Sequence, residues 1–289
     1  MQKKPDDQLL FTGNYIICRK DMFMRKFNDL ALSIAALLVS YGVYKLSGLL
    51  LNSLNNDFLA DFLQQGIFAV MVFLSVLVLR KTWIYHSDLR KLKVGWTAGL
   101  VMLIPLSAAA LQAFAMISDI SVTGFELILF VARMLLIGFC EEALFRGLIQ
   151  NDFHNIFGEN STLRVFLGVI CGALCFGAMH LGNALKPEVS LSAAAVQSVF
   201  TFFSGILFAT VYFRTGKNLW FVVLVHAIDD FFAFIAAGRL SGSNEGQAIV
   251  AASSATNSGP LQLLFAFCFY SAISLFLLRP KKIRQLQEL

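Results

Sequence analysis

Eight long apolar runs are the feature that most constrains what this sequence can fold into. A helix of about 20 apolar residues is long enough to cross the roughly 30 Å hydrocarbon core of a bilayer. The runs lie at about 29–53, 58–80, 95–118, 122–149, 163–183, 190–213, 218–238 and 260–279. No stretch shows the alternating short strands that a transmembrane barrel needs. We therefore expect an all-α, polytopic membrane protein with about eight transmembrane helices.

The distribution of basic residues predicts how these helices are oriented. An even number of spans puts both termini on the same side of the membrane, and 19 of the 23 lysines and arginines fall on that side. Cytoplasmic loops carry the excess of Lys and Arg in membrane proteins, so both termini should be cytoplasmic. The net charge of +5 then reflects topology, and we expect membrane lipids, but no nucleic acid, as partners.

The chain shows no internal repeat and no domain boundary. Three segments follow from its hydropathy: a basic cytoplasmic or interfacial N-terminal segment at 1–28, a single transmembrane domain at 29–279, and a basic cytoplasmic tail at 280–289. Residues 8–26 mix apolar and basic side chains, which fits an interfacial helix or a disordered basic tail. Residues 239–259 are rich in small polar side chains and should form a flexible external loop.

Two adjacent carboxylates and an arginine interrupt the fourth apolar run. A charged side chain at the centre of a membrane-spanning helix costs roughly 2.5 to 3.5 kcal/mol, so such residues usually have a function. Glu142 and Arg146 are four residues apart with the acid first, which favours a helical ion pair. Glu141 projects about 100° away around the helix, so we expect it to face the bundle interior while the pair supports the helix.

Two of the four histidines also fall in apolar runs. His180 continues the row of Gly168 and Gly172, a small-residue pattern that lets transmembrane helices approach closely, so this face should point into the bundle. His226 and Asp230 are four residues apart, which lets the carboxylate fix the tautomer of the imidazole. Counted from the predicted turns at 1.5 Å per residue, both histidines lie in one layer with Glu141, roughly 14 Å from the cytoplasmic boundary.

Such a layer supports two kinds of chemistry. A carboxylate and two imidazoles in a dry site can act as a general base that activates water, a group that orients the water and a group that stabilises an oxyanion. The same donors, Glu141, His180, His226 and Asp230, also describe a catalytic zinc site with an open position. The spacing alone leaves both alternatives open, so the expected cofactor is either none or zinc.

Arg133 is a further candidate in the same run. It follows Glu126 by seven residues on one helical face, so it could snorkel or form an ion pair. Alternatively, a basic group near the site could bind a substrate carboxylate.

The ordered motifs on successive apolar helices resemble those of the CAAX protease and bacteriocin-processing family, also called the Abi family, which includes the Ras-converting CAAX endoproteases. The resemblance covers about residues 120–240 and is carried by three motifs: Glu141-Glu142-xxx-Arg146, Phe176-xxx-His180 and His226-xxx-Asp230.

The resemblance implies an intramembrane endopeptidase of about eight helices. In it, the residue matching Glu141 would activate water with help from the one matching His180. The residues matching His226 and Asp230 would stabilise the oxyanion or, in a metal-dependent mechanism, bind metal together with the other two. Glu142 and Arg146 match the supporting pair. Eukaryotic CAAX enzymes carry asparagine where this chain has Asp230, whereas bacterial-type members accept aspartate.

The expected substrate is a membrane-anchored protein or peptide, either CAAX-type and lipidated or of the bacteriocin or leader type. The compact chain is similar to bacterial members, so we expect a multi-pass protein of a bacterial plasma membrane whose active site opens toward the cytoplasmic half. Two alternatives remain: a proton- or ion-coupled transporter, because buried acids and histidines also form proton relays, and a non-catalytic immunity or scaffold relative. The sequence leaves the oligomeric state open.

Overall fold

The computed structural model describes residues 13–288, apart from 52, 116, 118–119, 244–246, 248–249 and 251–259. Within the described residues every regular element is a helix, so the predicted all-α class is confirmed. The longer helices are α1 (Gly13–Leu51), α2 (Asp57–Val78), α3 (Leu89–Gly99), α4 (Leu103–Ala115), α5 (Gly124–Glu142), α6 (Asn151–Phe157), α7 (Thr162–His180), α8 (Leu191–Arg214), α9 (Leu219–Ala236), α11 (Pro260–Leu277) and α12 (Pro280–Gln287). The short connecting helices are η2 (Thr82–Tyr85), η3 (Leu100–Met102), η5 (Ala143–Gln150), η6 (Leu181–Leu185) and η7 (Arg239–Ser241).

Each of the eight predicted spans is helical in the structure. Among the described residues, six stretches are long and apolar enough to cross a membrane: Asp21–Leu51, Asp57–Val78, Leu89–Ala115, Thr162–Leu185, Leu191–Arg214 and Leu219–Ala236. The other two predicted spans correspond to α5, which carries four charged residues, and to α11. The protein is therefore an integral, multi-pass membrane protein, while the count of eight and the cytoplasmic termini stay predictions.

Large apolar side chains cover the outer surface of the bundle. Leu49, Leu111 and Phe114 are each more than 70% exposed, and many other leucines and phenylalanines of these helices are exposed as well. Contiguous apolar surface of this extent is unfavourable in water and marks a region that contacts lipid or protein. The outer surface is therefore the lipid-facing surface of the bundle.

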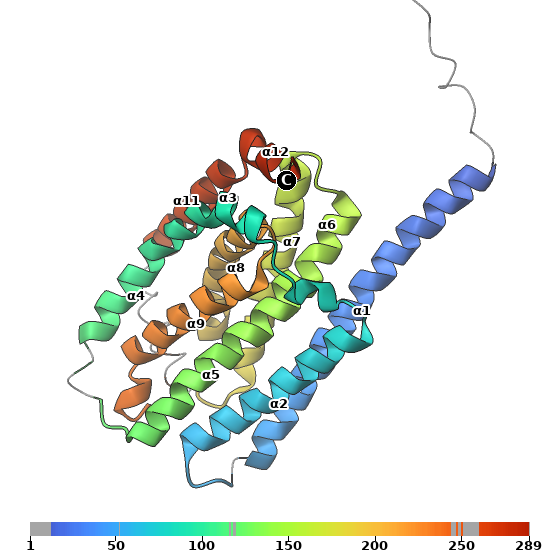
Figure 1. Ribbon diagram of the computed structural model, residues 1–289. Helices are drawn as coiled ribbons and strands as arrows, with labels where there is room; N and C mark the ends of the chain where they lie inside the picture. Colours follow the sequence, from blue (N-terminus) through green and yellow to red (C-terminus); the bar gives the residue numbers. More distant parts are fainter. Residues whose placement is uncertain are drawn as a thin grey trace, which may run out of the picture.

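The helices that carry the polar motifs lie at the centre of the bundle. Figure 1 shows α5 between α2 and α9, with α7 and α8 behind it. The close pairs are α7 with α8, α5 with α9, α2 with α5, and α4 with α9. These helices share one large apolar core, in which Leu144, Phe145 and Tyr212 are fully buried.

Basic segments from distant parts of the chain meet at one end of the bundle, which we call the basic end. Lys81, after α2, pairs with Asp152 of α6 at 2.5 Å, and Lys217, between α8 and α9, pairs with Glu159 at 2.6 Å. The C-terminal helix α12 lies at the same end, next to α3 (Figure 1). Gln287 donates a hydrogen bond to the carbonyl of Glu159 at 2.6 Å.

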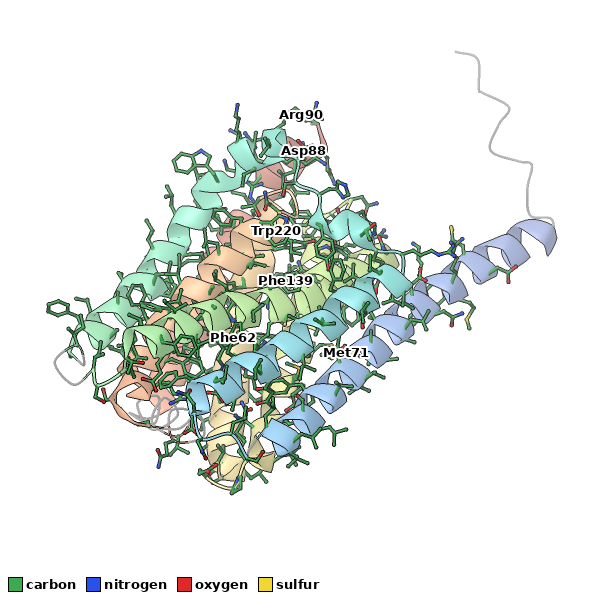
Figure 2. The ribbon with its side chains drawn as sticks, turned by 60° about the horizontal axis from the view of Figure 1, so that its bottom comes forward. Phe62, Met71, Asp88, Arg90, Phe139 and Trp220 are labelled. Atoms are coloured by element: carbon green, nitrogen blue, oxygen red, sulfur yellow. The ribbon has the colours of Figure 1, made fainter. Side chains whose placement is uncertain are left out.

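Aromatic side chains lie near this end of the bundle. Figure 2 shows Trp220 beside Phe139, with Asp88 and Arg90 further toward the tip of α3. The ring centroids of Trp220 and Phe139 are 6.1 Å apart, and the indole nitrogen of Trp220 donates to the carbonyl of Tyr85 at 3.0 Å. Half-exposed tryptophans are typical of the boundary between membrane and water.

The predicted terminal and loop segments are only partly described. Residues 13–26 continue into the first span as one helix, α1, whereas residues 1–12 lie outside the described part. The predicted tail forms α12, in which Ile283 and Leu286 are buried against the bundle, and residue 289 is not described. Of the predicted loop at 239–259, the first three residues form η7, and most of the remainder lies outside the described residues.

Candidate active site

A close approach of two helices positions the two carboxylates opposite a histidine. A Cβ atom on Gly138 of α5 would lie 2.7 Å from the carbonyl oxygen of Val223 on α9, which is too short for any side chain. Because Gly138 has no side chain, the two backbones can pack together one turn before Glu142. This contact brings the end of α5 to the middle of α9, where His226 lies.

Glu142 binds two other side chains in the core. Its Oε1 atom lies 2.6 Å from Nδ1 of His226 and 2.9 Å from Nη1 of Arg146, and its side chain has no exposed surface. The predicted ion pair between Glu142 and Arg146 is therefore present. Nδ1 of His226 is bound by Glu142, which the spacing did not indicate, whereas Asp230, the partner expected from the spacing, lies 3.6 Å from Nε2.

The second nitrogen of His226 faces two other carboxylates. Its Nε2 atom lies 3.5 Å from Oε2 of Glu141 and 3.6 Å from Oδ2 of Asp230. These two side chains are 16% and 21% exposed, in contrast to the fully buried Glu142. As the spacing predicted, Glu141 projects away from Glu142, and it reaches the open side of the imidazole.

A π-helix follows the two carboxylates directly. Residues Ala143–Gln150 form η5 and are all buried. Its wider turn changes the rise and rotation per residue, so the depth of 14 Å calculated for a regular α-helix does not apply to this segment. π-helical turns occur frequently at functional sites. The π-helix carries Arg146, whose guanidinium lies 4.4 Å from the centre of the Phe176 ring and 5.5 Å from that of Phe208.

His180 ends α7 and has a defined tautomer. Its Nδ1 atom lies 2.9 Å from the carbonyl oxygen of Phe176. A carbonyl can only accept a hydrogen bond, so Nδ1 carries the proton. In the neutral imidazole, Nε2 is then an acceptor.

The glycine row that precedes His180 packs as predicted. A Cβ atom on Gly168 would lie 1.9 Å from Cδ2 of His154, and one on Gly172 would lie 3.1 Å from Cβ of Gln150. The row therefore lets α7 lie directly against η5 and α6. This packing sets the position of His180 relative to Glu141.

One cavity of about 270 Å³ brings the predicted site residues together. Its lining includes Glu141, His180, His226 and Asp230, together with Asp229 and Arg133. The structure therefore brings the predicted carboxylate and the two imidazoles together around one cavity. Glu142 and Arg146 lie behind this lining, in the core.

The aromatic lining of the cavity includes Phe176, which belongs to the motif Phe176-xxx-His180, and Phe208, which the sequence did not indicate. The ring of Phe176 packs edge-on against His180, with centroids 4.8 Å apart, and against His226 at 6.1 Å. Phe208 lies 5.1 Å from His226. Among the 29 phenylalanines of the chain, nothing in the local sequence distinguishes Phe208 from those that face lipid.

Arg133 has an ion-pair partner that spacing could not predict. Its Nη1 atom lies 3.2 Å from Oδ2 of Asp61 on α2, and Arg239 binds the same oxygen at 2.9 Å. Arg133 is 3% exposed, so it does not snorkel to the surface. Glu126, the partner considered from the sequence, forms the N-terminal capping box of α5 with Thr123.

The positions of the four predicted ligands decide whether the cavity fits a zinc ion. Among the described residues, no three His, Cys, Asp or Glu side chains are grouped closely enough to hold a metal ion. His226 uses Nδ1 to bind Glu142, and His180 uses Nδ1 to bind a carbonyl, so each has one nitrogen for the cavity. As arranged, the four predicted ligands do not fit a tetrahedral zinc ion, and zinc stays a prediction for metal analysis to test.

One segment of the chain is similar to a known protein family. Residues 123–232 match the family model described as type II CAAX prenyl endopeptidase Rce1-like. This part of the chain, 110 of the 289 residues, is similar to an Rce1-like CAAX protease domain, and we call it the Rce1-like domain. The domain begins at the N-terminus of α5 and ends in α9, so it contains Glu141, His180, His226 and Asp230.

The Rce1-like domain confirms the resemblance that the three sequence motifs indicated. It also supports membership of a family of intramembrane endopeptidases. No curated protein and no solved structure matches the chain. The roles of individual residues therefore rest on the geometry of the cavity.

Proposed function

We propose that the protein is an intramembrane endopeptidase that hydrolyses a peptide bond with a water molecule activated by Glu141. The observation that carries the proposal is the shared cavity, because Glu141, His180 and His226, all from the Rce1-like domain, line one space. The substrate class we propose is a membrane-anchored protein or peptide.

Glu141 is proposed as the general base. It is the less buried of the two adjacent carboxylates, and it lines the cavity while Glu142 is held by His226 and Arg146. Glu141 takes a proton from water, and the resulting hydroxide attacks the carbonyl carbon of the scissile bond. A positioned general base contributes about 10²- to 10⁴-fold to such a step.

His180 is proposed to orient the water. Because Nδ1 donates to the carbonyl of Phe176, Nε2 accepts a hydrogen bond from the water and directs one lone pair of its oxygen toward the substrate. The edge-on ring of Phe176 restricts rotation of the imidazole.

His226 is proposed to stabilise the tetrahedral oxyanion. Glu142 holds Nδ1, so a protonated Nε2 can donate a hydrogen bond into the cavity. Hydrogen-bond donors fixed before the reaction stabilise the charge that develops in the transition state. Protonated Glu141 then transfers its proton to the leaving nitrogen, the carbon–nitrogen bond breaks, and a carboxylic acid and an amine are released.

Asp230 is proposed to support His226 from the cavity side. Its Oδ2 atom lies 3.6 Å from Nε2, and an ionised aspartate cannot itself donate a hydrogen bond to an oxyanion. Its carboxylate instead stabilises the protonated form of His226.

The proposal is tested by reconstituting the purified protein in liposomes with two peptide probes, one farnesylated at a C-terminal CAAX-type sequence and one with an apolar leader segment. Wild-type protein should cleave at least one probe, and His180→Ala should abolish this cleavage without changing the thermal unfolding of the protein. Ion or solute flux in the absence of cleavage of any membrane-anchored peptide would instead support a transporter and refute the proposal.

A further inference from the structure

The cavity extends from the proposed catalytic residues in one direction only. Along α5 its lining residues run from Arg133 through Ile137 to Glu141, and Glu141 is the one nearest the basic end. Along α9 they run from Ala237 to His226, and His226 is the one nearest the basic end. On both helices the remaining lining residues lie toward the opposite end.

The other two helices of the Rce1-like domain show the same order. The lining residues of α7 and η6 begin at Phe176 and continue away from the basic end to Asn183. Those of α8 begin at Phe208 and continue away from the basic end to Gln197. All four segments therefore place the catalytic layer at the floor of the cavity.

A fully packed polar layer closes the bundle between this floor and the basic end. Gln150 donates to the carbonyl of Ala209 at 2.9 Å, and Asn151 donates to the hydroxyl of Tyr212 at 2.8 Å. Gln150, Asn151 and Tyr212 are at most 1% exposed. Because these side chains are buried and hydrogen-bonded, we expect no route for a peptide from the basic end through the described part of the chain. The sequence had led us to expect an opening toward the cytoplasmic half.

One wall of the cavity suits an extended peptide. Gln197, Thr201 and Ser204 lie at positions i, i+4 and i+7 of α8, which is one helical face, and we call them the α8 row. Asn183 donates to Oε1 of Gln197 at 2.8 Å, which directs the Gln197 amide along the wall. Within the described part of the chain, the Nε2 donors of Gln197 can then bind a peptide carbonyl.

The two hydroxyls of the α8 row add hydrogen-bond acceptors. Thr201 donates its proton to the carbonyl of Gln197 at 2.9 Å, and Ser204 donates to the carbonyl of Thr201 at 3.2 Å. Their lone pairs can accept hydrogen bonds from peptide N–H groups. At 1.5 Å per residue the row is about 10 Å long, which matches about three residues of extended chain.

We propose that the substrate peptide reaches Glu141 from the end of the bundle opposite the basic end, extended along the α8 row. Because segments rich in Lys and Arg stay in the cytoplasm, this entrance faces the non-cytoplasmic side of the membrane. That the molecule entering the cavity is a peptide rests on the proposed function. The side from which it enters does not.

Side-specific labelling of an engineered cysteine tests the entrance. Gln197→Cys is exposed to a membrane-impermeant thiol reagent in right-side-out and in inverted vesicles, and modification at residue 197 is measured by mass spectrometry. Ser87→Cys, an exposed position at the basic end, and Ser192→Cys, an exposed position at the opposite end, are the matched controls. Cysteine 197 should be modified from the same side as cysteine 192, and from the opposite side to cysteine 87.

Modification of cysteine 197 from the same side as cysteine 87, or from neither side, would overturn the proposal. Ala237→Cys, at the same end of the cavity on α9, is the second position if Gln197→Cys does not fold. The labelling does not depend on activity, so it should be unchanged in a Glu141→Gln background. In the active protein, complete modification of cysteine 197 should reduce peptide cleavage at least ~10-fold, and unchanged cleavage would contradict the path along α8.

Discussion

Oε1 of Glu142 lies 2.6 Å from Nδ1 of His226, across 84 positions of sequence. The same oxygen lies 2.9 Å from Arg146, so one buried carboxylate fixes both the arginine of its own helix and the imidazole of α9. Glu142 thereby determines which nitrogen of His226 faces Glu141 and the cavity. The adjacent acidic residues have separate roles, one structural and one at the cavity surface.

Glu142→Gln should abolish most of the activity while keeping the shape of the site. The amide retains the size of the carboxylate but removes the charge that Arg146 and His226 share, so the protonated form of His226 is no longer favoured. We expect kcat to fall by about 10² or more with a smaller change in KM. The measurement is steady-state cleavage of the peptide probe in liposomes.

Glu126→Gln is the matched control for this substitution, because Glu126 lies on α5 but belongs to its N-terminal cap. It should keep kcat near the wild-type value. Equal losses in the two variants would show that any change of charge on α5 is damaging, and would contradict a specific role for Glu142.

The contact between Gly168 and His154 should be essential for stability. A Cβ atom at position 168 would lie 1.9 Å from the imidazole, so Gly168→Ala should lower the free energy of unfolding by about 1 to 3 kcal/mol, as overpacking does. The double variant with His154→Ala removes the clashing ring and should recover part of this loss. Thermal unfolding in detergent measures both effects, and additive losses in the double variant would refute the contact.

Burial, together with the nearby Lys217, lowers the pKa of His154 to about 4, below the ordinary value of 6.5. The unfolded chain therefore binds a proton between pH 6.5 and about pH 4, whereas the folded protein does not. His154 should destabilise the fold progressively as the pH falls through this range and have no such effect above it. In His154→Gln the corresponding part of the pH dependence of thermal unfolding should disappear, and an unchanged pH profile would exclude the buried neutral histidine.

Metal analysis separates the two mechanisms that the sequence left open. Glutamate-activated hydrolysis predicts less than stoichiometric zinc in the purified, active protein and no inhibition by chelators. Stoichiometric zinc that is lost together with activity, and that restores activity when added back, would reverse this assignment.

The helices, and the helical faces that the polar residues share, were predictable from the sequence because both depend on local spacing. Apolar runs of sufficient length determine the spans, and spacings of four residues place Glu142 with Arg146 and His226 with Asp230 on shared helical faces. The glycine row before His180 likewise indicated a close helix contact, which the structure contains.

The partners that lie far apart in the sequence could not be predicted in the same way. The bond between Glu142 and His226 and the ion pair of Arg133 with Asp61 depend on how α2, α5 and α9 pack. No feature of the sequence after Glu142 indicated a π-helix. Because the rise per residue differs between a π-helix and an α-helix, the depth of Glu141 in the membrane could not be calculated from α-helical geometry. The direction of the cavity follows from the tertiary packing of four segments, so it became visible only in the structure.

The most direct test of the proposed mechanism is the rate of peptide cleavage by Glu141→Gln in liposomes, compared with wild type and with Asp229→Asn. Asp229 lines the same cavity, so its variant controls for the loss of one cavity carboxylate. Glu141→Gln should lose about 10²- to 10⁴-fold in kcat, the contribution of a general base, while its thermal unfolding stays unchanged and Asp229→Asn keeps most of the activity. Cleavage by Glu141→Gln at a rate close to that of the wild type would contradict the proposal that Glu141 activates the water.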